Sequence, residues 1–150
     1  MLFYLIALSV LFIDQVIKFI VERSILVGQS VHLIPGLLSL THVRNTGAAF
    51  SLFTGFSPYL ALVSFIIILG VIYLHHSFLK KGARIDIGLA LVLGGSLGNL
   101  IDRLFRFQVV DYLDIHIWPV FNLADMMINL GVLLIIIQLI RKEKDASDPH

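Results

Sequence analysis

The chain has no cysteine among its 150 residues, which excludes disulfide bonds, cysteine metal ligands and a thiol nucleophile. Charged residues are also scarce, at 14% of the sequence against 58% hydrophobic residues, and this is too little charge to cover a soluble domain. The net charge of +1, without a basic outer cluster, gives no indication of nucleic-acid binding. The zinc-binding H-E-x-x-H motif, the G-x-S-x-G nucleophile elbow and a glycine-rich phosphate loop are missing as well.

The sequence does contain apolar runs of membrane-spanning length. A helix needs roughly 20 apolar residues to cross the hydrocarbon core, and four segments qualify, namely 2–21, 58–79, 85–103 and 121–140. We therefore predict an all-α membrane protein, with one domain over residues 1–150 made of four transmembrane helices and a charged tail at 141–150. The first run has no basic segment before it and no A-x-A-like cleavage site after it, which favours a retained helix over a cleaved signal peptide.

Lysine and arginine residues are unevenly divided between the two ends of this bundle. Six of them lie in the second connection or after the fourth helix, and three lie in the first and third connections. The positive-inside rule then places both termini in the cytoplasm and the first and third connections outside. The first outer connection, 22–57, is long and apolar, and strand-like stretches within 37–53 predict a small extracytoplasmic β-sheet there, with Leu38, Leu40, Phe50 and Phe53 facing lipid or substrate.

Polar residues that are costly in a membrane gather at the outer ends of three of these helices. At helical spacing they share one face of each helix, and they are Asp14 and Lys18, then Ser96, Asn99 and Arg103, then Asn122, Asp125 and Asn129. Such faces must be turned towards the bundle interior or water. Gly94 and Gly98 on the third helix permit a close approach of a neighbouring helix.

Asp111 and Asp125 are the strongest candidates for chemistry. Neither has a basic neighbour in the sequence, and Val109, Val110 and Tyr112 give Asp111 an apolar setting. Two carboxylates in such a site cannot both ionise cheaply, so one holds a proton while the other acts as a base. Their spacing alone leaves open that they are two unrelated carboxylates.

Other polar residues have a structural interpretation. Lys18 keeps Asp14 ionised, which suits a structural or positioning pair better than proton transfer. Asp102 is expected to pair with its neighbour Arg103 in the same way. Asn45 fits either a turn or a hydrogen bond to an extended peptide backbone.

Five sequence blocks carry a resemblance to a known family. They are Asp14-Gln-x-x-Lys18, His42-Val-Arg-Asn45-Thr-Gly-Ala-Ala-Phe50, Gly98-Asn-Leu-Ile-Asp-Arg103, Val109-Val-Asp111 and Phe121-Asn-Leu-Ala-Asp125. In this order, over residues 14 to 125, they resemble the lipoprotein signal peptidases, or signal peptidase II.

The resemblance implies a bacterial aspartic endopeptidase of the inner membrane that cuts prolipoproteins before a diacylglyceryl-modified cysteine. It implies that Asp111 and Asp125 are catalytic and that eight further residues bind substrate or support the site, namely Asp14, Lys18, Asn45, Gly98, Asn99, Arg103, Asn122 and Ala124. It implies no metal and no cofactor. The expected partners are the prolipoprotein and membrane lipid, without nucleic acid, and we expect a monomer.

Two other classes of protein compete with this interpretation. A small four-helix transporter would use Asp14 as a proton-coupled carboxylate, but that role needs an unpaired acid near the bilayer midplane. A purely structural membrane subunit leaves the cost of Asp125 unexplained. Asp114 is expected to be solvated and to have no role in chemistry.

Overall fold

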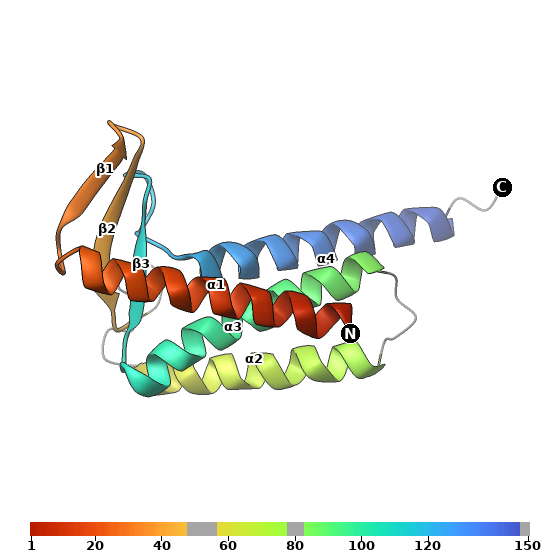
Figure 1. Cartoon of the computed structure of the whole chain (residues 1–150). Coiled ribbons are helices and arrows are strands. Elements are labelled where there is room, and N and C mark those ends of the chain that lie inside the picture. The colour runs from red at the N-terminus through yellow and green to blue at the C-terminus, as the bar shows by residue number, and fades with distance from the viewer. Residues whose placement is uncertain (48–56, 78–82, 148–150) are drawn as a thin grey trace.

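The computed structural model describes residues 1–47, 57–77 and 83–147 of the chain. Within these ranges four helices run side by side, α1 (Leu2–Ser24), α2 (Ser57–Ser77), α3 (Ala83–Phe105) and α4 (Leu123–Ser147). A three-stranded sheet lies across one end of the helices, and the N-terminus and the end of α4 lie at the opposite end (Figure 1).

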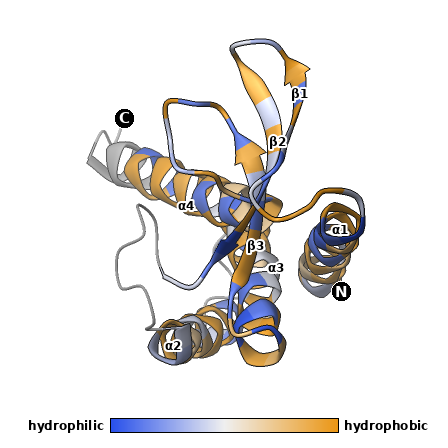
Figure 2. Cartoon of the chain, turned by 90° about the vertical axis from the view of Figure 1, so that its left-hand side faces the viewer, coloured by the Kyte–Doolittle hydropathy of each residue, from blue (hydrophilic) through white to orange (hydrophobic). Residues whose placement is uncertain are grey.

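Helix α3 is the centre of the bundle. Its most apolar 18-residue window is 78% buried, whereas the corresponding windows of the other three helices are 11–28% buried. Seen from the sheet end, α1, α2 and α4 surround α3 (Figure 2). All four helices are long and apolar enough to cross a membrane, which confirms the predicted spans. Large apolar side chains such as Phe12, Ile66 and Leu133 are exposed on the outer helices, as lipid-facing surfaces require.

Glycines let α1 approach α3 closely. A Cβ on Gly94 would lie 2.6 Å from the carbonyl oxygen of Ala7, and a Cβ on Gly98 would lie 2.5 Å from Asp14 Oδ2. The Gly94-x-x-x-Gly98 pattern therefore has the predicted effect, because any larger residue would push the two helices apart. An apolar cluster that includes Phe3, Ala7, Ile68 and Leu89 packs α1 and α2 against α3.

The sheet has the antiparallel order β1 (Ser30–Ile34), β2 (Leu38–Asn45) and β3 (Val109–Asp114). Its first two strands come from the connection between α1 and α2, as predicted, but only β2 lies within the predicted segment 37–53, and β1 precedes it. The third strand comes from the connection between α3 and α4, where the sequence predicts no strand. Leu38 and Leu40 are half-buried, and the predicted contacts of Phe50 and Phe53 lie outside the described residues.

The start of the fourth helix differs from the prediction. The sequence predicts a helix from Phe121, but α4 begins at Leu123. Phe121 instead exchanges backbone hydrogen bonds with Leu113 of β3, at 2.7 and 3.0 Å, and Asn122 caps the helix. Asp125 therefore lies in the first turn of α4, beside the sheet, rather than a full turn below the helix start.

Candidate active site

Asp125 and Asn122 form a reciprocal capping box at the start of α4. Asn122 Oδ1 accepts the backbone N–H of Asp125 at 2.9 Å, and Asp125 Oδ2 accepts the backbone N–H of Asn122 at 3.3 Å. The positive end of the helix dipole favours a carboxylate at this position. The helix start therefore holds the Asp125 carboxylate in one place.

Side chains from two other elements satisfy the remaining N–H groups of this first turn. Leu123 donates its N–H to the Tyr112 hydroxyl at 3.1 Å, and Ala124 donates to Asp14 Oδ1 at 3.0 Å. An unsatisfied N–H group within a membrane protein is costly, so these contacts stabilise the helix start. Asp14 from α1 and Tyr112 from β3 thus anchor the end of α4 that carries Asp125.

Asp111 approaches the same place from β3. Its side chain is buried, and both of its oxygens accept amide hydrogens, Oδ2 from Asn45 Nδ2 at 2.8 Å and Oδ1 from Asn122 Nδ2 at 2.6 Å. Asn45 pairs with Val109 in the β2–β3 ladder, while Asp111 pairs with Val43. Asn45 and Asp111 are therefore diagonal neighbours on one face of the sheet, and the strand register brings them together.

Asn99 of α3 connects the two aspartates. Its Nδ2 donates to Asp125 Oδ1 at 2.8 Å, and its Oδ1 accepts a hydrogen bond from Asn122 Nδ2 at 3.2 Å. Both aspartates line one cavity of 470 Å³, whose polar wall also includes Asn45, Asn99 and Arg103. The rest of the lining is largely apolar and includes Val109, Ile115, Trp118, Phe121, Met126 and Ile128.

The environment of Asp111 alters its acidity. Burial raises the pKa of Asp111 to about 7, with a further contribution from the negative charge of Asp125. The hydrogen bonds from Asn45 and Asn122 favour the ionised form and oppose this rise. Asp111 can therefore keep a proton near neutral pH, where an ordinary aspartate has lost it.

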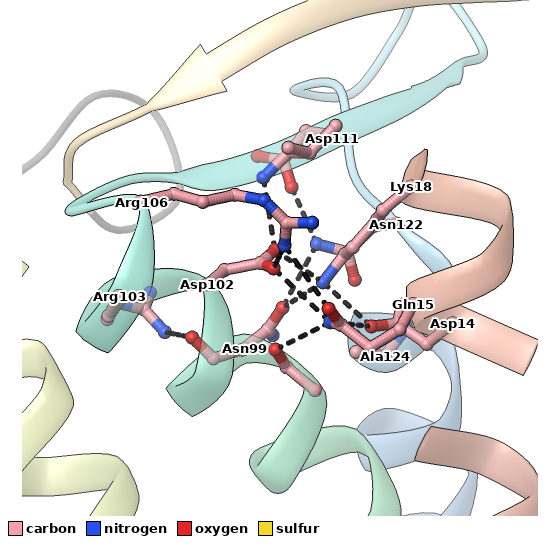
Figure 3. A network of polar contacts seen from close by, with 12 residues as sticks. Asp14, Gln15, Lys18, Asn99, Asp102, Arg103, Arg106, Asp111, Asn122 and Ala124 are labelled. Atoms are coloured by element: carbon pink, nitrogen blue, oxygen red, sulfur yellow. Dashed lines mark hydrogen bonds and ion pairs between the residues drawn. The ribbon is translucent and has the colours of Figure 1, made fainter. Parts of the chain in front are cut away.

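A buried ion network joins Lys18 of α1 to Asp14, Asp102 and Asn99, close to Asp111 and Asn122 (Figure 3). Lys18 Nζ lies 2.8 Å from Asp14 Oδ2, 2.8 Å from Asp102 Oδ2 and 3.0 Å from Asn99 Oδ1. The Lys18, Asp14 and Asp102 side chains are 0% exposed. Removing any one of these charges would leave a buried group with one ion-pair partner fewer, so the network supports the fold at this level of the bundle.

The expected ion pair between Asp102 and Arg103 is not what the structure shows. Asp102 binds Lys18 and also Arg106, one helical turn further along α3. Consecutive residues of a helix do not face each other, whereas residues four apart do. Arg103 instead points along the cavity wall, and its guanidinium donates to the backbone carbonyl of Asn99 at 3.5 Å.

The ten predicted site residues lie around this cavity or directly behind it. Asn45, Asn99, Arg103, Asp111 and Asp125 line the cavity, and the residues behind it are Asp14, Lys18, Gly98, Asn122 and Ala124.

Four further residues of the site have no predicted support role, namely Gln15, Asp102, Arg106 and Tyr112. Gln15 Nε2 donates to Asp102 Oδ1 at 3.2 Å, and Gln15 Oε1 accepts from Arg106 at 3.2 Å. The helical spacing of Asp102 from Asn99 and from Arg106 was the available signal. Tyr112 gave no such signal, because its hydroxyl contact depends on how β3 packs on α4.

Asp114 is less solvated than the sequence suggests. Its carboxylate accepts the Thr41 hydroxyl at 2.9 Å and the backbone N–H of His116 at 2.9 Å, and its side chain is 18% exposed. The hydrogen bond from His116 lowers the pKa of Asp114. Asp114 thus holds the end of β3 to β2, away from the cavity.

Two carboxylates that line one cavity can act as acid and base on the same substrate. Among the described residues, no group of three or more histidine, aspartate or glutamate side chains is arranged to hold a metal ion. The arrangement of Asp111 and Asp125 suits the activation of a water molecule for hydrolysis.

Comparisons with known proteins agree with this geometry. The family model described as signal peptidase (SPase) II matches residues 6–141. A lipoprotein signal peptidase of Halothermothrix orenii is 38% identical, over 94% of this chain and 97% of its own length. One from Halalkalibacterium halodurans is 36% identical, over 98% of this chain and 97% of its own. A bacterial membrane enzyme solved by the in meso method at 2.3 Å resolution has a TM-score of 0.88 and 33% identity, covering 97% of this chain and 92% of that one.

Proposed function

The chain belongs to the signal peptidase II family, and we propose that it removes signal peptides from prolipoproteins with Asp111 and Asp125 as its catalytic pair. It is an aspartic-type membrane peptidase. The observation that carries the residue assignment is that both carboxylates line one cavity while each accepts a side-chain amide hydrogen.

In the proposed mechanism Asp125 is the base and Asp111 the acid. Asp125 takes a proton from water while the water oxygen attacks the scissile carbonyl carbon, and Asp111 gives its proton to the carbonyl oxygen. When the C–N bond breaks, Asp125 gives its proton to the leaving amine and Asp111 recovers one from the tetrahedral intermediate. The raised pKa of Asp111 and the position of Asp125 at a helix N-terminus support this division of roles.

The polar wall of the cavity supports a role in holding the peptide. Arg103 lines the same cavity as both aspartates, and its guanidinium can donate hydrogen bonds to the carbonyl groups of an extended peptide. Asn99 and Asn122 orient the carboxylates, since each donates to one of them. The apolar lining suits contact with the substrate side chains before the cut and with the lipid on the cysteine. In this proposal the signal helix enters the bundle laterally while the lipid stays in the bilayer.

We further propose that the sheet and the cavity face the outside of the cytoplasmic membrane, with both termini in the cytoplasm. The basic residues of the second connection and the C-terminal tail support this orientation. The competing transporter role for Asp14 loses its support, because this carboxylate is fully buried and bound to Lys18 and to the Ala124 N–H.

The test is cleavage of a diacylglyceryl-modified prolipoprotein by purified protein in detergent. Asp111→Asn and Asp125→Asn should each abolish cleavage without unfolding the protein, and the double variant should be hardly worse than either single one. Asp114→Asn is the matched control, since it changes an aspartate of the same strand outside the cavity. Substantial cleavage by either single variant would remove that residue from the catalytic pair.

A further inference from the structure

Lys18 contacts Asn99, which in turn donates a hydrogen bond to Asp125. The chemistry of Lys18 fixes the direction of its own hydrogen bonds. Its ammonium group only donates hydrogen bonds. It spends its three donors on Asp14 Oδ2, Asp102 Oδ2 and Asn99 Oδ1. Asn99 must therefore turn its amide oxygen towards Lys18, whereas an asparagine by itself has no preferred direction.

That direction decides which group Asn99 presents to Asp125. With its oxygen held by Lys18, Asn99 points Nδ2 at Asp125 Oδ1, 2.8 Å away. The same Asn99 oxygen accepts from Asn122 Nδ2 at 3.2 Å, so Asn122 also presents its amide nitrogen on this side. The Asn122 nitrogen donates in addition to Asp111 Oδ1 at 2.6 Å. Lys18 thus fixes the direction of the Asn99 amide, whereas the Asp125 backbone N–H, which Asn122 Oδ1 accepts at 2.9 Å, fixes the direction of the Asn122 amide.

The opposite direction would change the chemistry. If Asn99 were turned by half a rotation, its amide oxygen would face Asp125 Oδ1, and two acceptors would be in contact. Such a contact disfavours the ionised carboxylate and favours its protonated form. The base of the proposed mechanism would then be a poorer proton acceptor.

We propose that Lys18 is a positioning residue that sets the hydrogen-bond direction of Asn99, and through it the protonation of Asp125 in the catalytic pair. This inference rests on the proposed function of Asp111 and Asp125. Lys18 does not line the cavity. Its positive charge also acts on Asp111, where it lowers the pKa of the carboxyl. Both variants compared below lose this charge, so a difference between them reports the direction of the Asn99 amide.

The experiment compares two charge-balanced double variants of the full chain. Lys18→Met with Asp14→Asn removes the donor, whereas Lys18→Gln with Asp14→Asn keeps a side-chain N–H that can still face Asn99. In the methionine variant we expect kcat to fall on the order of 10–100-fold. KM should be unchanged, and the acid limb of the pH–rate profile should move to higher pH. The glutamine variant should recover most of kcat and the parent's profile.

A purely structural role for Lys18 would lower the melting temperature without moving the pH–rate profile. Arg106→Gln provides the reference for such an effect. Arg106→Gln, which loosens the same network on the side away from Asn99, should lower the melting temperature and leave both limbs of the pH–rate profile in place. The other charged groups around the pair, Asp102 and Arg103, are unchanged in these variants. The methionine and glutamine variants share the change at Asp14. Equal pH profiles for the methionine and glutamine variants would overturn the proposal.

Two further measurements keep the proposal testable if the methionine variant does not fold. In an Asn99→Leu background, replacing Lys18 should have no additional effect on the pH profile, and an undiminished effect would contradict the proposal. Asn99→Asp keeps oxygens for Lys18 and Asn122 but loses the donor to Asp125, so it should reproduce the loss of kcat, and full activity would overturn the argument. Substantial cleavage by Asp111→Asn would instead refute the proposed catalytic pair, which separates the two failures.

Discussion

Replacing Asn45 with alanine removes the amide hydrogen that Asp111 Oδ2 accepts at 2.8 Å. This hydrogen bond favours the ionised form of Asp111, and burial of the carboxyl limits replacement of the lost donor by water. Loss of the donor therefore raises the pKa of Asp111. In the proposed mechanism Asp111 carries the proton, so activity should persist to higher pH in the variant.

The size of the effect follows from the strength of the lost contact. A hydrogen bond to a charged group contributes about 1.5–3 kcal/mol, and about 1.4 kcal/mol corresponds to one pH unit. The pKa of Asp111 is about 7 in the parent. The alkaline limb of the pH–rate profile should therefore move upward by about one to two pH units in Asn45→Ala.

The assay is the rate of cleavage of a lipidated prolipoprotein between about pH 5 and about pH 10. Measurements at intervals of about half a pH unit resolve both limbs of the profile. Thr41→Val is the matched control, because it removes a donor 2.9 Å from Asp114 on the same pair of strands, outside the cavity. Its profile should coincide with that of the parent. An Asn45→Ala profile that also coincides with the parent would show that Asn45 does not act on the proton of Asp111.

Three other predictions concern stability. Gly98→Ala should destabilise the protein by about 1–3 kcal/mol, since its Cβ would meet Asp14 Oδ2 at 2.5 Å. Gly70→Ala, where a Cβ meets nothing within 4 Å, should be neutral. Equal melting temperatures of the Gly98→Ala and Gly70→Ala variants in detergent would refute the packing argument. Asp14→Ala leaves Lys18 buried without one of its partners and should cost about 3–5 kcal/mol, and a normal melting temperature with lost cleavage would place Asp14 in the chemistry instead. Folding raises the pKa of Asp111 from 3.8 to about 7, so ionising it destabilises the fold progressively as pH rises through that window. The melting temperature of Asp111→Asn relative to the parent should therefore rise between pH 4 and pH 7, and a constant difference would contradict the raised pKa.

The arrangement of the helices was largely predictable because it depends on local properties. Apolar length identifies a membrane span, and residues three or four apart share a helix face whatever the helix packs against. Asp14 and Lys18, four residues apart on α1, do form an ion pair. Gly94 and Gly98 similarly predict a close helix contact from their spacing alone.

The sheet was only partly predictable. The first outer connection supplies β1 and β2, but the strand that carries Asp111 has no alternation of polar and apolar residues over Val109–Tyr112 to indicate it. Its residues Val109, Val110, Asp111 and Tyr112 are all buried, so both faces are covered and the usual strand pattern is lost. The pairing of β2 with β3 then decides that Asn45 contacts Asp111, 66 residues away in sequence.

The sequence by itself determined that the protein spans a membrane, which helices carry polar faces, and that Asp111 and Asp125 stand without a basic neighbour. Only the tertiary structure decided what those residues touch: Asp14 accepts the N–H of Ala124, 110 residues away, and Asp102 pairs with Lys18 rather than Arg103. The physical reason is that spacing within one helix fixes a face, whereas the partner of that face depends on how helices cross and how strands register. The direction of the Asn99 amide depends on all of these contacts at once, because it follows from the lysine that α1 brings against α3.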